Sequence, residues 1–256
     1  QSPSDFELEE ISVIGTKTGK LTDEVPATVT VILEDKVKRE IVRDISDLIR
    51  NEPGVSVSGI SSRFSLSGFN IRGIEGDRIQ ILIDGIRTPD EFASGGHFLD
   101  SRRDFVDIDL IESVEILKGS GSSLYGSDAI GGVVSFTTRT PSSYLSTDEA
   151  IYFSTKSGYS SKNNGITNTG YFGFGGDRVA TLITYTNKNS NETKTAGTSG
   201  FSGKLRQEAD PADIKLENFS LHTDFDLSKG QVVSLLFEDY KNEADFNVLS
   251  EVGNVV

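Results

Sequence analysis

The stretch GSGSSLYGSDAIGGVVSF, residues 119–136, combines closely spaced glycines with an apolar end. Glycines of this kind can cradle a phosphate, but a dinucleotide-binding motif needs G-x-G-x-x-G followed by a helix. Four residues separate Gly121 from Gly126, and residues 133–136 are typical of a strand. A Walker loop needs Lys and then Ser or Thr after its last glycine, which neither Gly126 nor Gly132 has. The stretch therefore predicts tight turns between short strands rather than a phosphate site.

The composition narrows the classes of function. The chain has 256 residues and a formal net charge of −14, which opposes nucleic-acid binding. It has no cysteine, which excludes disulfides, thiolate metal sites and cysteine nucleophiles. It has no methionine either, so Gln1 is not expected to be the translation start, as after removal of a signal peptide or trimming of the chain. No apolar run is long enough for a membrane-spanning helix, but the alternating strands of a transmembrane barrel would not produce such a run.

Residues 1–141 predict a mixed unit of helices and strands. Apolar residues recur at helical spacing between Val37 and Ile49, and Pro53 ends this amphipathic helix. Strands are expected at residues 26–33, 77–87 and 133–139.

After Pro141 the helical spacing disappears and alternating strands are expected. The clearest is residues 219–227, in which Phe and Leu side chains face one side and Ser, His and Asp side chains the other. Tight turns at 175–177 and 228–230, with a long polar connection at 188–213, are typical of an outer-membrane barrel. The edge of a soluble β-sandwich is the alternative. Because five such strands cannot close a barrel, the barrel interpretation predicts a longer chain.

Four segments, in this order, resemble the plug domain of TonB-dependent outer-membrane receptors. They are EISVIGTKT (10–18), ISDLIRNEPGVSV (45–57), FNIRGIEGDRIQILIDGIR (69–87) and LIESVEILKGSGSSLYGSDAIGGVVSFTTR (110–139). In that family the plug lies inside a barrel of about 22 strands. The resemblance implies an α+β plug domain followed by the first antiparallel strands of a transmembrane β-barrel. The expected domains are a TonB box with a flexible N-terminus, the plug and the first barrel strands, at residues 1–20, 21–141 and 142–256.

The resemblance also implies a role for the N-terminal segment. A TonB box is expected to be extended, mobile and exposed to the periplasm when substrate is bound. It can add as a strand to the sheet edge of a TonB-type energy-transducing protein through main-chain hydrogen bonds. An ordinary disordered N-terminus is the alternative. The expected contact residues are Glu10, Ile11, Ser12, Val13, Ile14, Gly15 and Thr16.

Two cations and six glycines are further site residues that the resemblance implies. Arg72 and Lys118 occupy positions where the family keeps cations that pair with barrel-wall carboxylates as a releasable latch; surface charges are the alternative. Lys118 and Ser120 stand where the family usually has Arg and Pro, so a less bidentate pairing and a less rigid turn are expected. The glycines expected to form the plug turns are Gly73, Gly85, Gly119, Gly126, Gly131 and Gly132.

Within the family, receptors for haem, often taken from haemoglobin, look closest. The resemblance lies in GIRTPDEFASGGHFLDSRRDFVDIDLIESVEILKG, residues 85–119. His97 in this stretch is the candidate ligand of haem iron, and an ordinary hydrogen-bonded or solvated loop histidine is the alternative. His222 lies on the polar face of an expected strand and is predicted to line the lumen.

The sequence thus predicts a TonB-dependent receptor in the outer membrane of a Gram-negative-type bacterium, with a periplasmic N-terminus. Its expected partners are a TonB-type protein, outer-membrane lipid and an iron carrier such as haemoglobin. Haem or a ferric chelate is the expected transported ligand, with no permanently bound cofactor or metal. The alternatives are a ferric-siderophore receptor of the same family and a periplasmic or surface binding module without transport. No enzyme activity is expected, because the Gly-x-Ser-x-Gly elbow of a hydrolase is missing.

Overall fold

The computed structural model describes residues 11–12, 14–16, 20–21, 27–40, 42–58, 68–89, 106–145, 150–228 and 230–253. The chain divides into two compact units, and each is described by itself. The first unit comprises residues 1–59, 66–104 and 111–138. The second comprises residues 60–65, 105–110 and 139–256. The second unit therefore includes two short segments, residues 60–65 and 105–110, that lie in the sequence within the predicted plug.

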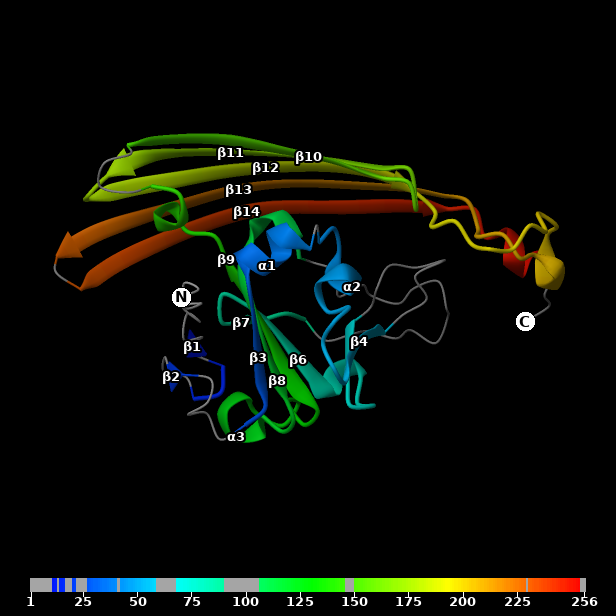
Figure 1. The fold of residues 1–256 in the computed structure, drawn as a ribbon, viewed down its shortest axis with the longest axis horizontal. Coiled ribbons are helices and arrows are strands. Elements are labelled where there is room, and N and C mark those ends of the chain that lie inside the picture. Colours follow the sequence, from blue (N-terminus) through cyan, green and yellow to red (C-terminus); the bar gives the residue numbers. More distant parts are fainter. Residues whose placement is uncertain are drawn as a thin grey trace, which may run out of the picture. The chain divides into compact units, whose positions relative to one another are not determined.

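A five-stranded mixed sheet forms the centre of the first unit (Figure 1). In order across the sheet, its strands are β3 (Val29–Leu33), β8 (Ile111–Lys118), β9 (Gly132–Thr138), β6 (Ile79–Ile83) and β7 (Ile86–Arg87). Strands β6 and β9 run parallel, and the other neighbours run antiparallel. Continuous apolar runs suit strands that are covered on both faces. The side chains with 0% exposure include Ile79, Val114, Ile116, Val133 and Phe136.

Short elements complete the first unit. Strand β1 (Ile11–Ser12) pairs with β2 (Lys20–Leu21), and β4 (Val55–Ser58) pairs with β5 (Gly68–Ile71). The helices are α1 (Glu34–Arg39), α2 (Ile45–Leu48), α3 (Ser122–Tyr125) and a 3-10 turn at Gly76–Arg78.

The prediction of one amphipathic helix around residues 37–49 is wrong, because the chain forms α1 and α2 instead. Asp44 separates them: its backbone is extended, and its side chain accepts the Asp47 N–H at 2.8 Å as an N-cap. The apolar spacing still holds in the packing, since Val37, Leu48 and Ile49 are all buried. The periodic side chains therefore face the core although the helix between them is interrupted.

The second unit contains a five-stranded antiparallel sheet, called here the wall strands. They are β10 (Ile151–Ser160), β11 (Gly165–Gly176), β12 (Val179–Asn191), β13 (Ala212–Ser228) and β14 (Gln231–Phe246), paired in sequence order. Single 3-10 turns lie at Ile108–Leu110, Pro141–Ser143, Gly203–Leu205 and Leu249–Glu251. The prediction of a mixed unit followed by alternating antiparallel strands is confirmed.

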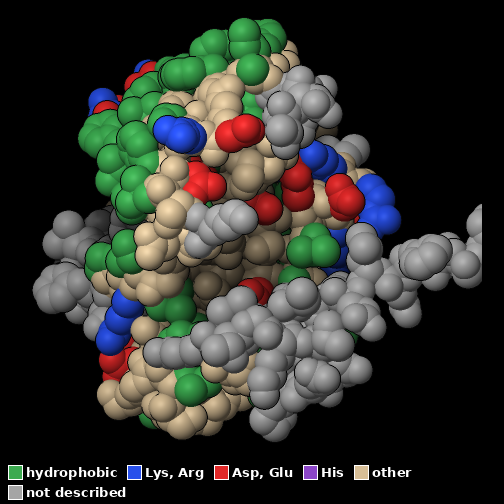
Figure 2. Space-filling view, turned by 90° about the vertical axis from the view of Figure 1, so that its left-hand side faces the viewer, with side chains coloured by type: hydrophobic (Ala, Val, Ile, Leu, Met, Phe, Trp, Pro, Cys, Tyr) green, Lys and Arg blue, Asp and Glu red, His purple; other side chains and the backbone are tan. Residues whose placement is uncertain are grey.

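The wall strands bury polar side chains and expose apolar ones. On β13, Asn218, Ser220 and His222 are 0%, 3% and 7% exposed, whereas Phe219 and Leu227 are 38% and 66% exposed. Hydrophobic side chains gather over these strands in Figure 2. This is the reverse of what water favours, because exposed apolar area is unfavourable there. The sheet therefore has a polar face and an apolar face, and the apolar face is suited to lipid.

The register shows that the apolar face forms a band with an edge. One row across all five strands is apolar and consists of Phe153, Phe172, Ile183, Leu221 and Phe237. Four residues further along each strand, on the same face, the row is polar and consists of Ser157, Asn168, Asn187, Glu217 and Lys241. Strand β13 has 17 residues, more than the about 9–11 needed to cross a bilayer, so its polar end extends past the band.

Within the described ranges, no helix has the length and apolarity needed to cross a membrane.

Candidate functional site

The predicted contact segment at the N-terminus is partly packed into the first unit. Ile11 and Ser12 form β1. Ile14 is 2% exposed and belongs to a core cluster with Leu82, Leu117, Ala129 and Val133. Its N–H donates to the Glu115 carboxylate at 3.0 Å. The sequence predicts that the segment is exposed when substrate is bound. In this structure Ile14 is buried, because an apolar side chain that reaches the core gains by burial.

The structure gives less information on the other residues of the segment 10–16. Gly15 and Thr16 are half-buried, and Glu10 and Val13 lie outside the described residues.

Lys118 is buried and pairs within the first unit. Its ammonium lies 3.5 Å from Glu52 Oε2 and donates to the Pro53 carbonyl at 3.2 Å. Glu52 also accepts from Lys36 at 2.9 Å. Burial would raise the pKa of Glu52, but the hydrogen bond and charge of Lys36 and the charge of Lys118 lower it below the usual range. In this structure Lys118 thus has a carboxylate partner, Glu52, within its own unit, and its pairing with a barrel-wall carboxylate stays a prediction.

Arg72, the second predicted cation, is exposed. Its backbone adopts φ 53°, and its N–H donates to the Gly54 carbonyl at 2.8 Å. The structure thus separates the two cations: one is buried in an ion pair and the other stands at the surface of a turn.

Five of the six predicted turn glycines have positive φ, and the sixth is needed for close packing. Gly132 has φ 156°, and a Cβ there would lie 2.5 Å from the Leu117 carbonyl oxygen. At Gly131 a Cβ would lie 2.5 Å from the Ile74 side chain. The remaining φ values are 87°, 77°, 140° and 94° at Gly73, Gly85, Gly119 and Gly126. The glycines make turns and allow close contact between strands, as the alternative to a phosphate site requires.

Of the two histidines, His222 is described by the structure and His97 is not. His97 lies outside the described residues. His222 is on the polar face of β13, as predicted; its Nδ1 is 3.1 Å from the Arg139 carbonyl oxygen. Its Nε2 is 3.3 Å from the Asp224 carboxylate. A carbonyl oxygen only accepts hydrogen bonds, so Nδ1 carries a proton.

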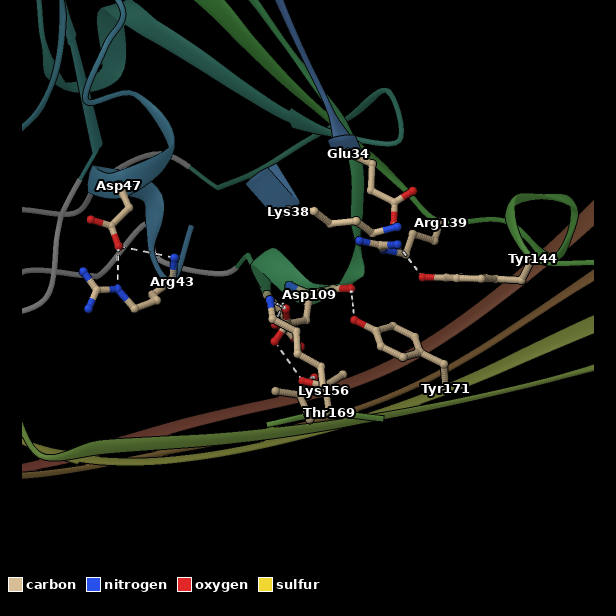
Figure 3. Close-up of polar contacts among 12 residues, drawn as sticks. Glu34, Lys38, Arg43, Asp47, Asp109, Arg139, Tyr144, Lys156, Thr169 and Tyr171 are labelled. Carbon is tan, nitrogen blue, oxygen red and sulfur yellow. Dashed lines mark hydrogen bonds and ion pairs between the residues drawn. The ribbon is translucent and has the colours of Figure 1, made fainter. Parts of the chain in front are cut away.

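A cluster that the sequence analysis missed lies in the second unit, where residues 106–110 meet the polar face of the wall strands. Four side chains from four strands form one row there in the register: Lys156, Thr169, Thr186 and Asn218, called here the donor row. Asp109 accepts from Lys156 at 2.5 Å and from Thr169 at 2.8 Å (Figure 3). Asp107 accepts from Asn218 at 3.3 Å and from Thr186. Asp109 thus contacts the half of the donor row on β10 and β11, and Asp107 contacts the half on β12 and β13.

Arg139 is the second missed residue, and it also lies in the second unit. It is 5% exposed, its guanidinium lies 5.6 Å from the ring centres of Tyr144 and Tyr171, and it donates to the Tyr144 hydroxyl (Figure 3). Its N–H donates to the Leu110 carbonyl at 2.8 Å. The Tyr171 hydroxyl donates to the Asp109 carbonyl at 2.9 Å. Residues 106–110 and Arg139 are therefore held on the wall strands by side-chain and main-chain hydrogen bonds.

A sequence signal for this cluster exists. Val106 to Leu110 alternates apolar and acidic residues, and buried carboxylates between apolar neighbours need partners. Within the described residues, no group of three or more His, Cys, Asp or Glu side chains is arranged to hold a metal ion.

Comparison with known proteins identifies the class. Residues 22–133 match the TonB-dependent Receptor Plug Domain family. The chain therefore belongs to the TonB-dependent receptors, a family of outer-membrane transport receptors rather than enzymes. Over most of its length the chain is also similar to individual receptors.

Three relatives illustrate this similarity. The chain is 28% identical over 251 residues to haemoglobin-binding protein A of Haemophilus influenzae, covering 93% of the chain and 25% of that protein. It is 32% identical over 203 residues to transferrin-binding protein A of the same species, covering 76% and 22%. It is 35% identical over 207 residues to haemoglobin-haptoglobin utilization protein B of Neisseria meningitidis, covering 75% and 24%. The chain thus spans about a quarter of the length of these relatives.

A solved structure has the same fold. FpvA of Pseudomonas aeruginosa, bound to heterologous pyoverdines, aligns with a TM-score of 0.69 at 15% identity, covering 91% of the chain and 28% of that protein.

Proposed function

We propose that the chain supplies the plug and the first wall strands of an outer-membrane receptor that imports haem, taken from haemoglobin. The observation that carries the transport role is the reversed burial of the wall strands, with Asn218 and His222 buried and Phe153 and Phe237 exposed. A soluble sandwich would bury the apolar face instead. The haem substrate is supported by relatives named for binding haemoglobin or haemoglobin-haptoglobin. The proposed domains are residues 1–20, 21–141 and 142–256.

Energy for uptake is proposed to enter through residues 10–16, on the periplasmic side. Strand β1 has two residues and, among the described strands, pairs with β2 alone, so few hydrogen bonds oppose its transfer to the sheet edge of a TonB-type protein. Ile14 would have to leave its core cluster and release the Glu115 carboxylate first. Exposure of the segment therefore costs free energy, because a buried side chain and a hydrogen bond are lost.

The ionic latch is proposed to act inside the plug. Lys118 shares Glu52 with Lys36, so a movement that breaks one pair leaves the carboxylate neutralised by the other. Arg72 remains the candidate for a partner on a part of the receptor beyond this chain.

Two other iron carriers have support. A ferric-siderophore receptor is favoured by the fold shared with FpvA, and iron from transferrin is favoured by the 32% identity to a transferrin-binding protein. A binding module without transport is disfavoured by the exposed apolar band, which needs a membrane.

The substrate is tested by titrating the complete receptor with haemin and recording the Soret band. We expect a Soret shift and haemin-dependent growth, with His97→Ala weakening both. His222→Gln is the matched control, because that imidazole is enclosed between Arg139 and Asp224 and is expected to leave the spectrum unchanged. Absence of any shift with the wild-type receptor, combined with uptake of a ferric siderophore or of transferrin iron, would refute the haem assignment.

A further inference from the structure

The two carboxylates that meet the donor row are compensated differently. Asp109 has a cation, Lys156, at 2.5 Å and a hydroxyl, Thr169, at 2.8 Å. Asp107 is 7% exposed, and the donors that it has among the described residues are neutral: Asn218 at 3.3 Å, the Asp109 N–H at 3.1 Å, and Thr186. Among the described residues, no Lys or Arg lies within ion-pair distance of Asp107. An ionised Asp107 is therefore a buried charge beside a second negative charge, which is unfavourable.

The neighbouring amide has the complementary problem. Asn218 is 0% exposed, and its amide nitrogen donates to Asp107 at 3.3 Å and to Glu238 at 2.9 Å, so both hydrogens are used. Its Oδ1 has no hydrogen-bond partner in the part of the chain that the structure describes. A buried acceptor without a donor carries the full penalty of its lost hydration.

One proton on Asp107 removes the first problem and supplies a donor for the second. It neutralises the uncompensated carboxylate, and it adds an O–H beside an amide whose Oδ1 lacks a donor among the described residues. Turning the amide about its last side-chain bond exchanges Oδ1 and Nδ2, so Oδ1 accepts from protonated Asp107 while the hydrogen bonds that Nδ2 donates to Asp107 and Glu238 are given up. We propose that Asp107 is a protonatable positioning residue, whose proton tightens the hold of residues 106–110 on β12 and β13 and whose loss loosens it.

The charged groups around Asp107 determine the pH range. Among the described residues these are Asp109 on the same segment, Lys156 on β10 and Glu238 on β14, with the titratable but neutral Tyr171 on β11, while β12 and β13 contribute the neutral Thr186 and Asn218. Burial and the charge of Asp109 raise the pKa of Asp107 to about 6.

The direction in which pH changes the attachment of residues 106–110 follows from the pKa of Asp107. An exposed Asp titrates near about 3.9, so between about pH 4 and pH 6 the attached segment holds more protons than the released one. Attachment is therefore firmest in acid, weakens as the pH rises through 6, and stays constant above about pH 7.

In a transporting receptor, the loss of this proton would make residues 106–110 leave the wall strands more readily at neutral pH. Only this link to transport rests on the proposed function, because the attachment of the segment is measured without substrate and uptake is measured separately.

The test is hydrogen exchange in the complete receptor, following the amides of residues 106–110 from pH 4.5 to 8 with correction for the intrinsic pH dependence. For the wild-type protein we expect protection to rise about tenfold between pH 7.5 and pH 5. Asp107→Asn should give a flat profile at or above the wild-type level in acid. Asp213→Asn is the matched control, since Asp213 is an exposed carboxylate on β13, the strand that carries Asn218, and should behave as wild type.

Two results would overturn the proposal: a flat wild-type profile, or a tenfold response that persists in Asp107→Asn. If that variant fails to assemble, carbon-13 NMR of the wild-type Asp107 carboxyl decides the matter. Titration near pH 6 supports the proposal, and titration near pH 4 refutes it.

Discussion

Lys118 and Gly132 lie opposite each other in the register between β8 and β9, and each resists substitution for a different reason. Lys118 is 8% exposed and held by a carboxylate and a carbonyl. Gly132 leaves space for the backbone of β8, because its missing side chain would meet the Leu117 carbonyl. One position is thus fixed by hydrogen bonding and the other by contact distance.

We expect Lys118→Met to destabilise the first unit by about 1–2 kcal/mol. It leaves the Pro53 carbonyl without its donor, while Lys36 still neutralises Glu52. Hydrogen exchange of β3 and β8 in the complete receptor measures the effect. Lys36→Met is the control and should cost less, because the Lys36 side chain is 30% exposed against 7% for Lys118. Equal exchange in both variants would mean that burial does not strengthen the pair.

We expect Gly132→Ala to destabilise the plug by about 3 kcal/mol or more, through strain at a positive φ and overpacking. A Cβ there would lie 2.5 Å from a backbone oxygen and 2.7 Å from Ile71 Cδ1. The amount of plug that resists proteolysis in outer-membrane preparations measures it. Gly158→Ala is the control, since a Cβ at Gly158 has no atom within 4 Å. A stable Gly132→Ala plug would contradict the steric argument.

At the scale of elements, the number of main-chain hydrogen bonds along a strand determines how readily that strand can leave its sheet. Within the part of the chain that the structure describes, β1 is a two-residue strand with one neighbour, β2, whereas β8 is bonded on both sides, to β3 and β9. Opening β1 breaks far fewer main-chain hydrogen bonds than opening β8. This supports the proposal that the N-terminal segment can leave the first unit and bind a partner.

We expect Val13→Pro to abolish energised uptake and to leave surface binding of substrate intact, because proline removes an N–H and strand addition needs it. Uptake of labelled haemin, with and without a proton-motive force, measures the first effect, and haemin binding to whole cells measures the second. Asp5→Pro, upstream of the segment, is the control and should transport normally. Wild-type uptake in Val13→Pro would remove residues 10–16 from the proposed contact.

At the scale of the whole molecule, the chain combines a unit with an apolar core and a sheet with an apolar exterior. The first follows the rule for proteins in water, and the second reverses it. One chain therefore contains a unit suited to water and a sheet suited to lipid. The burial pattern changes near residue 139, where the long continuous part of the second unit begins.

We expect Phe237→Lys to destabilise the receptor in a bilayer by about 2–4 kcal/mol, because it places a charge in the apolar band. Asp245→Lys, on the same face but past the polar row, should change stability by less than about 1 kcal/mol. Urea unfolding of the complete receptor from lipid vesicles measures both. Equal effects of the two variants would mean that no lipid boundary lies between positions 237 and 245.

Most of the fold could be predicted because it depends on local pattern. Alternation along 219–227 corresponds to β13, and the glycines of 119–132 lie at turns and close contacts. The helix at 37–49 was predicted less well, because its apolar spacing continues through the capping residue Asp44, which interrupts it. Site residues were harder, since Asp107 and Asp109 matter only through contacts with strands more than 45 residues away, such as Asp109 with Lys156 at a separation of 47.

The sequence by itself determined the order of the elements, the positions of the glycine turns, the two faces of the wall strands and the family. Each follows from periodicity or from residue type at a fixed spacing, which neighbours along the chain decide. Only the tertiary structure decided that Lys118 pairs with Glu52, that Ile14 is buried, and that two carboxylates meet the donor row. These depend on the register of distant strands and on competition among nearby charges for partners, and neither is encoded in any short segment.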